Sequence, residues 1–500
     1  MTPNDPRPEE TLDPADWNAM RALGHRMVDE MMTYLETVRD RPAWQPIPDE
    51  VKAALRAPLP QEPRSPEAVY EDFRRLVLPY PLGNIHPRFW GWVIGTGTPL
   101  GVLSDMLAAT MNPNVGGAEH TGSRVEVQVM DWCKEMMGYP REASGLLVSG
   151  GSMANLVGLA VARNAKAEGD LAQAGLAAMP RRMTLYASSE THNSVKKAVS
   201  LLGLGREALR QIPVDAEFRI DLAALRKAIA ADRAAGQHPF CVVGNAGTVN
   251  TGALDDLEAI ADLCRDQDLW FHVDGAFGAL AALSPALRPR VRGMERADSL
   301  AFDFHKWMYM PFEVGCVLVR HEEHHHATFT APAEYLARSD RGTASGPTWF
   351  SEYGVQLSRG FRALKVWMSL QEHGARKYGR LIEQNVAQAV YLTERVERTP
   401  ELELMAPTAL NIVCFRYRAP GLDDAMLDQL NQEILIGIQE AGVAVPTGTR
   451  LRGRYAIRVA NVNHRSRRED FDLLVDEVLA RGRAYASASS VAGSNQRSRS

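Results

Sequence analysis

Lys306 is the first residue of this sequence that could carry out chemistry. It lies inside the mostly apolar stretch SLAFDFHKWMYMPFEVGCVLV, residues 299–319. A lysine in apolar surroundings is costly unless its amine is paired or reaches water. Burial also favours the uncharged amine, which can attack a carbonyl carbon. Lys306 is therefore a candidate nucleophile, and a lysine whose ammonium simply reaches solvent is the alternative.

Two other stretches could complete a site with this lysine. Asp274 ends the apolar stretch WFHVD, and Gly150, Gly151 and Ser152 follow the apolar stretch LLVS. Open α/β sheets bind ligands at the carboxyl ends of their strands, and amides at a helix N-terminus bind phosphate. Each feature alone has a simpler explanation, as a helix cap or a tight turn. Together, a phosphate cradle, an acid for a pyridinium nitrogen and a Schiff-base lysine are what pyridoxal phosphate requires.

The elements that must position these residues follow an alternating pattern. Short apolar stretches alternate with amphipathic stretches of helical length, which predicts βαβ units and a mainly parallel sheet. We predict a large α/β domain over residues 98–385 and a smaller α/β domain over 386–485. Residues 1–97 are predicted to be a helical segment with few core residues of its own, and 1–15 to be disordered. The polar tail 486–500 is also predicted to be disordered.

Composition limits the class of protein. The 500 residues are 45% hydrophobic and 23% charged, and the net charge of −5 argues against a nucleic-acid partner. No run of about 18 apolar residues or basic leader suggests a membrane span or signal peptide. The five cysteines lack paired spacing, which is typical of reduced thiols, so we expect a cytoplasmic protein. The stretch RHEEHHHATF, 320–329, is interpreted as a solvated helix, and no metal is predicted.

Several motifs, in order, resemble the pyridoxal-phosphate-dependent decarboxylases of the aromatic-L-amino-acid and glutamate decarboxylase group. The resemblance covers roughly residues 15–480, and HVDGA followed by HKW is its most specific part. It implies an α/β fold of the aspartate-aminotransferase-like type (fold type I) and pyridoxal 5'-phosphate as cofactor. The motifs that carry it are NIHPRFWGW, VEVQVMDW, SGGSMANL, SSETHNSVKKA, NAGTVNTGALDDL, HVDGAFG, ADSLAFDFHKW and SRGFRALKVW.

The resemblance implies a role for each matching residue. Lys306 is implied as the lysine that binds the cofactor covalently, Asp274 as the partner of its ring nitrogen, and His192 as the residue stacked over its ring. Asp303 occupies a position where relatives often carry asparagine near the phosphate, and a carboxylate there would be repulsive. The remaining cofactor contacts implied are Gly151, Ser152, Thr248, Ala276 and His305.

The resemblance also implies decarboxylation of a small-molecule L-amino acid to an amine and CO2 by a homodimer. In the family, a loop tyrosine is implicated in protonating the substrate carbon. Phe350 falls near the corresponding place, with Tyr335 and Tyr353 nearby. Relatives with phenylalanine at that place consume oxygen and form an aldehyde, so an aromatic aldehyde synthase is the alternative.

The sequence allows two interpretations of the substrate class. Trp90, Trp92 and Phe350 would suit an aromatic side chain, but such residues serve equally well in a core or dimer interface. An acidic substrate would need a cation, for which Arg88, Arg124 and Arg359 are available. An aminotransferase, a carbon–carbon lyase or a non-catalytic scaffold on the same fold are further alternatives, although a scaffold would be expected to lose Lys306 or Asp274.

Overall fold

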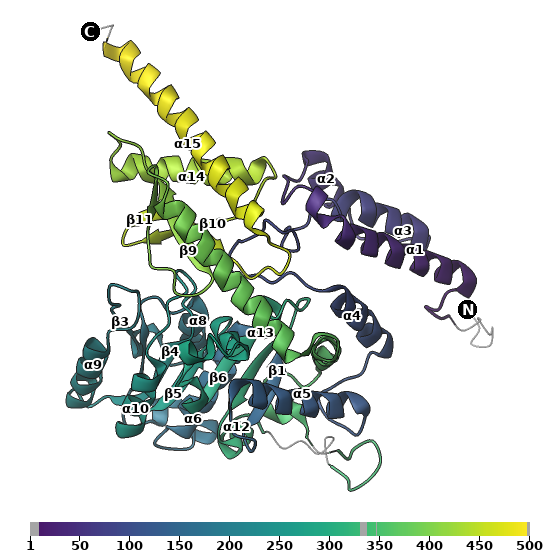
Figure 1. Cartoon of the computed structure of the whole chain (residues 1–500). Helices are drawn as coiled ribbons and strands as arrows, with labels where there is room; N and C mark the ends of the chain where they lie inside the picture. The colour runs from purple at the N-terminus through teal and green to yellow at the C-terminus, as the bar shows by residue number, and fades with distance from the viewer. Residues whose placement is uncertain (1–9, 331–337, 347, 498–500) are drawn as a thin grey trace.

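The N-terminal part of the chain forms a group of helices beside the rest of the molecule (Figure 1). The computed structural model describes residues 10–330, 338–346 and 348–497, with 486–497 as backbone alone. Asp16 begins the first helix by accepting hydrogen bonds from the amides of Asn18 and Ala19. These helices are α1 (Trp17–Glu36), α2 (Asp49–Ala54), α3 (Pro66–Asp72) and α4 (Pro99–Met111).

A seven-stranded sheet forms the centre of the larger domain. Its strand order is β1-β7-β6-β5-β4-β2-β3, and all strands except β7 run in one direction. Every residue of β1, β2, β5, β6 and β7 is buried, as expected for a sheet covered on both faces. The strands are β1 (Ser144–Val148), β2 (Met183–Ser188), β3 (Leu209–Ile212), β4 (His238–Asn245), β5 (Trp270–Asp274), β6 (Ser299–Asp303) and β7 (Gly315–Val319).

Helices cover this sheet and connect its strands. α6 packs against β1 and β4 to β7, and both α8 and α12 pack against α6. α5 packs against β1, and α13 packs against α4 and α5. The helices are α5 (Thr121–Met137), α6 (Gly151–Ala165), α7 (Leu171–Ala174), α8 (Asn193–Leu201), α9 (Leu222–Ala234), α10 (Leu257–Asp266), α11 (Phe304–Trp307), α12 (Glu322–Phe329) and α13 (Arg362–Glu397).

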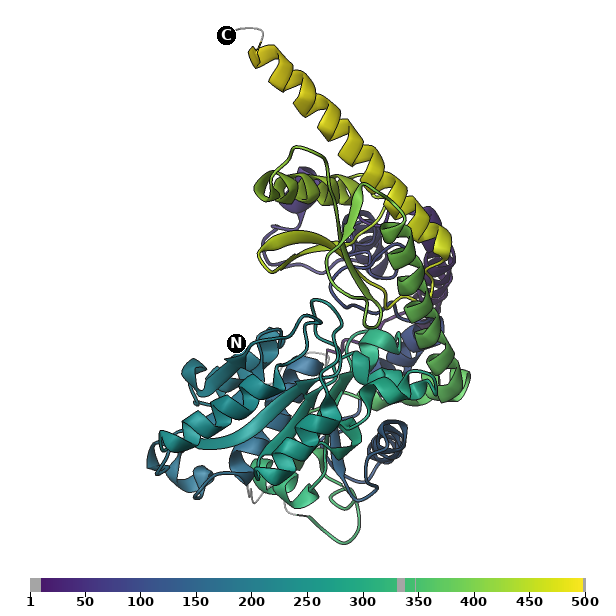
Figure 2. The same ribbon diagram turned by 60° about the vertical axis from the view of Figure 1, so that its left-hand side comes forward.

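The long helix α13 leads from the larger domain to a second, smaller sheet (Figure 2). Gly374 interrupts it with a left-handed φ of 68°, which glycine adopts without steric cost. The smaller sheet is antiparallel, in the order β10-β11-β9-β8. Its elements are β8 (Leu402–Leu404), β9 (Ile412–Tyr417), α14 (Asp424–Glu440), β10 (Thr447–Leu451), β11 (Arg454–Ala460) and α15 (Arg468–Arg497).

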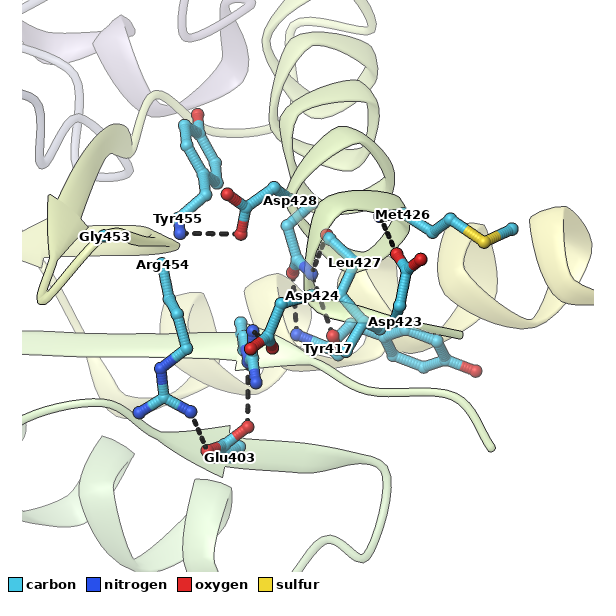
Figure 3. A network of polar contacts seen from close by, with 12 residues as sticks. Glu403, Tyr417, Asp423, Asp424, Met426, Leu427, Asp428, Gly453, Arg454 and Tyr455 are labelled. Atoms are coloured by element: carbon cyan, nitrogen blue, oxygen red, sulfur yellow. Dashed lines mark hydrogen bonds and ion pairs between the residues drawn. The ribbon is translucent and has the colours of Figure 1, made fainter. Parts of the chain in front are cut away.

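Polar contacts fasten α14 to the smaller sheet (Figure 3). Asp428 of α14 accepts a hydrogen bond from the amide of Tyr455, at 2.8 Å. Glu403 of β8 accepts one from the guanidinium of Arg454, at 3.2 Å. These contacts lie within the smaller domain, so the domain holds its own sheet and helix together.

The fold confirms the predicted α/β class and the mainly parallel sheet of the larger domain. The boundary at residue 385 lies within α13, and we retain it as a proposal. α15 continues to Arg497 and so enters the tail 486–500, where the sequence predicts disorder; alanines in this stretch favour helix. In the described part of the chain, no helix combines the length and the apolarity that a membrane crossing requires.

Candidate active site

The carboxyl ends of β1, β5 and β6 meet at one edge of the larger sheet. They do so because these three strands run in the same direction. The glycine turn follows β1, Asp274 ends β5, and Asp303 ends β6 immediately before α11. A cavity of about 320 Å³ opens there. Of the predicted site residues, it is lined by Gly151, Ser152, His192, Ala276, His305 and Lys306.

The glycine turn places the start of α6 at this cavity. The first helical hydrogen bonds to the Gly150 carbonyl come from the amides of Met153 and Ala154. The amides of Gly151 and Ser152 therefore precede the helical ladder, at the positive end of the helix dipole. A side chain at position 151 would lie 2.9 Å from Asp303 Oδ2, so only glycine fits without a shift. This end of the cavity can bind an anionic phosphate.

Asp274 presents a fixed carboxylate next to the cavity. Its side chain is buried, Oδ2 accepts a hydrogen bond from Asn155 Nδ2 at 3.0 Å, and Oδ1 accepts one from the Ala276 amide at 3.2 Å. Such a carboxylate can accept a hydrogen bond from a protonated ring nitrogen. The geometry is therefore compatible with the pairing predicted for Asp274.

Lys306 lies beside a second buried carboxylate. Its Nζ is 3.0 Å from Asp303 Oδ2, and its side chain is 20% exposed while that of Asp303 is 1% exposed. Asp303 Oδ1 is buried and has no hydrogen-bond partner among the described residues. The lysine amine thus lies at the cavity, paired with an acidic neighbour.

Two histidines border the cavity from different elements. His305 Nδ1 accepts a hydrogen bond from the Val314 amide at 3.1 Å, and its ring stacks on Phe312 with centroids 4.3 Å apart. His192 precedes α8, and its Nδ1 lies 2.8 Å from Ser194 Oγ. Burial lowers the pKa of both histidines below the usual value, which favours neutral rings.

Five of the predicted site residues lie outside the cavity lining: Asp274, which lies beside it, Thr248, Trp90, Trp92 and Phe350. Thr248 is buried within the loop after β4, where its hydroxyl lies 3.1 Å from the Thr251 hydroxyl. Trp90, predicted for the substrate pocket, is a core residue instead. Its ring stacks on Phe471 with centroids 4.7 Å apart, and its Nε1 donates to Ser466 Oγ. A large aromatic ring with a satisfied indole N–H is well suited to this buried position.

The structure also corrects the placement of Phe350. This residue is 2% exposed and packs in the core of the larger domain, with the Arg359 guanidinium 5.2 Å from its ring centre. Tyr353 is likewise occupied elsewhere, because its hydroxyl donates to Glu322 at 2.6 Å. Neither residue lines the cavity. Tyr335 lies outside the described residues.

Other residues at the site were missed from the sequence. Asn155, Ser194 and Phe312 all line the cavity. Asn155 follows Gly151 by four residues, so it lies on the same face of α6, and this spacing could have identified it.

Trp92 is 52% exposed, and the amide of nearby Gly95 donates to the His305 carbonyl. The segment of Trp92 therefore lies close to α11.

Comparison with known proteins identifies the family. A family model described as the pyridoxal-dependent decarboxylase conserved domain matches residues 48–418. This chain belongs to the pyridoxal-dependent decarboxylase family. The aromatic-L-amino-acid decarboxylase of Bacillus atrophaeus is 35% identical to it, over 92% of this chain and 95% of that protein. The histidine decarboxylase of Mus musculus is 30% identical, over 90% of this chain and 68% of that protein.

A solved structure supports the same assignment for the fold. Oryza sativa TDC with PLP and tryptamine superposes with a TM-score of 0.87 at 26% identity, over 95% of this chain and all of that one. The decarboxylase thus has the aspartate-aminotransferase-like fold, and its cofactor is pyridoxal phosphate. The cavity fits this cofactor, because amide donors and a lysine amine line it and the fixed carboxylate of Asp274 lies beside it. Among the described lining residues, Asp303 and Glu313 carry charge that opposes a phosphate, and Asp303 lies next to the glycine turn.

We predict that Asp303→Asn tightens cofactor binding. The substitution removes a buried negative charge next to the glycine turn, where the phosphate is expected to bind. We expect the dissociation constant of pyridoxal phosphate, measured by equilibrium dialysis at fixed ionic strength, to fall about tenfold, or ~1.4 kcal/mol. Asp232→Asn is the matched control, because Asp232 is also buried and pairs with a cation, Arg210, but lies outside the cavity lining. Unchanged or weaker binding in Asp303→Asn would contradict the prediction.

Proposed function

We propose that this decarboxylase converts an aromatic L-amino acid to the corresponding amine and CO2. Phe312 is the observation that supports an aromatic substrate most directly, since it lines the cavity and is 53% exposed. Trp92 offers a second accessible ring near α11. Aromatic side chains gain from stacking on such rings beyond the area they bury.

The charges around the cavity support a substrate without an acidic side chain. Asp303 and Glu313 are both among the residues that line it, and both would repel a substrate carboxylate placed nearby. No arginine occurs among the described lining residues. An acidic amino acid would therefore meet like charge where it needs a cation.

The three arginines considered for an acidic substrate have other partners. Arg359 is fully buried, and its guanidinium forms an ion pair with Glu126 and donates to the carbonyls of Val115 and Leu147. Arg88 donates to the Val443 carbonyl. Arg124 pairs with Glu119 on the surface, at 2.8 Å. These contacts support the proposal that none of them recognises a substrate.

Each part of the site has a proposed task in the reaction. Lys306 Nζ would hold the cofactor covalently, and the amides at the start of α6 would hold its phosphate. Asp274 would keep the ring nitrogen protonated, and His192 would cover the ring. When bound, pyridoxal phosphate supplies an electron sink for the bond that breaks as CO2 leaves. Fixed donors and acceptors of this kind favour charge that develops in a reaction.

Product analysis tests this function. Cofactor-loaded protein is incubated with tryptophan, tyrosine, phenylalanine, dihydroxyphenylalanine, histidine, glutamate and aspartate, and products are identified by mass. We expect aromatic amines as main products, with kcat/KM for glutamate at least about a hundredfold lower, because the lining carboxylates repel its side chain. Lys306→Ala is the inactive control. Preferential decarboxylation of glutamate or histidine would contradict the aromatic assignment.

The proton donor determines whether an amine or an aldehyde leaves the enzyme. Since Phe350 and Tyr353 both lie away from the cavity, Tyr335 is the remaining candidate from the sequence, and we propose to test it as the donor. Tyr335→Phe in the same assay is then expected to divert the product to aldehyde and ammonia, with consumption of O2 and formation of peroxide. Tyr353→Phe is the matched control and should keep the amine. Amine formation at the unaltered rate by Tyr335→Phe would exclude this donor.

We propose a homodimer in the cytoplasm. The five cysteines are all free, as expected for reduced thiols. Apolar side chains on the N-terminal helices remain accessible, including Trp17, Met27 and Val69 at 60%, 40% and 54% exposure. A second copy could bury them.

Sedimentation equilibrium of the whole chain tests the proposed assembly. We expect about twice the 55.2 kDa of one chain at micromolar concentration, because association buries the exposed apolar side chains. Replacing Trp17 and Met27 by serine should weaken the association, whereas replacing the remote, exposed Met426 should not. A single species of one-chain mass would contradict the proposal.

A further inference from the structure

Asn155 lies at the centre of a buried chain of hydrogen bonds that reaches two proposed catalytic groups. The chain begins on β5 and β6, where Trp270 Nε1 and His272 Nδ1 both lie 2.8 Å from Ser299 Oγ. His272 Nε2 lies 2.9 Å from Asn155 Oδ1. A side chain at Gly158 would lie 2.7 Å from His272 Cε1, so glycine there allows α6 to approach β5 this closely.

The direction of every bond in this first part is fixed by chemistry. The Trp270 indole can only donate, so Ser299 Oγ accepts from it and has its own hydrogen free to donate. Burial lowers the pKa of His272 to about 4, so its ring is neutral near pH 7. The Asp274 carboxylate can only accept, so Asn155 turns Nδ2 toward it and Oδ1 toward His272. Nε2 therefore carries the hydrogen that it donates to Asn155 Oδ1, and Nδ1 accepts from Ser299.

The side-chain amide of Asn155 extends this chain of directed hydrogen bonds to the cavity. Because Oδ1 accepts from His272, Nδ2 faces the other way and donates both of its hydrogens. One goes to Asp274 Oδ2 at 3.0 Å, and the other goes to Ser194 Oγ at 2.9 Å. The carboxylate can only accept, which agrees with this orientation. One buried side chain therefore contacts both the acid of β5 and the start of α8.

Ser194 completes the path to His192. Its Oγ accepts from Asn155 and so donates its own hydrogen to His192 Nδ1, at 2.8 Å. The Ser194 amide also donates to His192 Nδ1, at 3.2 Å. Two donors aimed at one nitrogen leave no room for a hydrogen on it, so the neutral ring must carry its hydrogen on Nε2.

We propose that Asn155 is a positioning residue, which orients the Asp274 carboxylate and fixes the hydrogen of His192 on Nε2. This inference rests on the proposed roles of Asp274 and His192. It explains how one residue can fix both the orientation of the Asp274 carboxylate and the hydrogen position on His192. Asn155 also follows Gly151 by one helical turn. α6, whose start is proposed to bind the phosphate, thus also positions Asp274, the proposed partner of the ring nitrogen, and His192, the imidazole proposed to cover the ring.

Other charges also act on His192 and must be kept constant in any test. Lys306 and Lys197 disfavour its protonated form, and Asp274 and Asp303 favour it, while burial is the largest influence and lowers its pKa. A substitution that introduces no charge at Asn155 is therefore required. Asn155→Leu meets this condition and keeps the number and branching of the side-chain heavy atoms.

A matched control exists in the smaller domain. Asn431 of α14 is also fully buried and makes three hydrogen bonds, with Tyr417 N, Tyr417 O and Leu427 O. Asn155 also makes three. Asn155→Leu and Asn431→Leu should therefore lower the unfolding temperature to a similar extent, so a purely structural role would affect both variants alike.

The experiment measures three quantities in these variants. They are the dissociation constant of pyridoxal phosphate, kcat for the best substrate, and the ¹⁵N shifts of the His192 ring in the cofactor-free full chain, assigned with His192→Gln. In the parent protein we expect an unprotonated Nδ1 and a protonated Nε2. In Asn155→Leu we expect the cofactor to bind about tenfold more weakly, kcat to fall about tenfold to a hundredfold, and Nδ1 to gain hydrogen. Asn431→Leu should stay within about twofold of the parent.

Ser194→Ala removes only the hydrogen bonds that link Asn155 to His192 through the Ser194 hydroxyl. It supplies a second test if Asn155→Leu does not fold. It should alter the His192 nitrogen shifts and kcat, and leave cofactor affinity unchanged, because the bond from Asn155 to Asp274 remains. Parent-like nitrogen shifts in Ser194→Ala, or parent-like affinity and kcat in a folded Asn155→Leu, would overturn the proposal. The nitrogen shifts need no substrate, so they test it even if the aromatic assignment fails.

Discussion

The parallel pairing of β5 with β6 is the constraint on which the whole site depends. Asp274 pairs in register with Ala301, so the carboxyl ends of the two strands, and the residues that follow them, meet at one edge. Both strands are fully buried, and a shift in their register would expose core side chains and separate Asp274 from Lys306. The hydrophobic core therefore sets the spacing of the proposed catalytic groups.

α6 adds the second constraint, because one helix serves three parts of the site. Its start faces the phosphate end of the cavity, and Asn155, one turn later, reaches Asp274 and the start of α8. Because α6 packs closely on β5, the buried polar groups between them have hydrogen-bond partners. A polar group without a partner would be costly in a low-dielectric interior. Asp303 is the exception, with one oxygen that has no described partner. A buried carboxylate oxygen without a partner is typical of sites that bind a ligand.

The sequence indicated the polar groups of the candidate site more readily than the residues that surround them. Lys306, Asp274 and the glycine turn could be singled out because each lies at or just after the end of an apolar strand and belongs to a specific motif. Its spacing from Gly151 could have placed Asn155 at the site, but its contacts could not be predicted, because its partners Asp274, Ser194 and His272 are distant in the sequence and meet only in the fold. Trp90 and Phe350 were misplaced for a different reason, since burial in a core and exposure to a substrate favour the same aromatic residues. The mainly parallel sheet followed from periodicity, whereas its strand order and the antiparallel pairing of β8 to β11 depend on long-range contacts.

The most direct test of the central claim is to locate the covalent link between protein and cofactor. Protein loaded with pyridoxal phosphate is treated with borohydride, which reduces and traps the link, and its peptides are mapped by mass. The structure predicts a single pyridoxyl group on Lys306. Exposure to excess amino-acid substrate before the reduction should prevent this labelling. A modified lysine elsewhere, or no modification at Lys306, would contradict the assignment of this cavity as the active site.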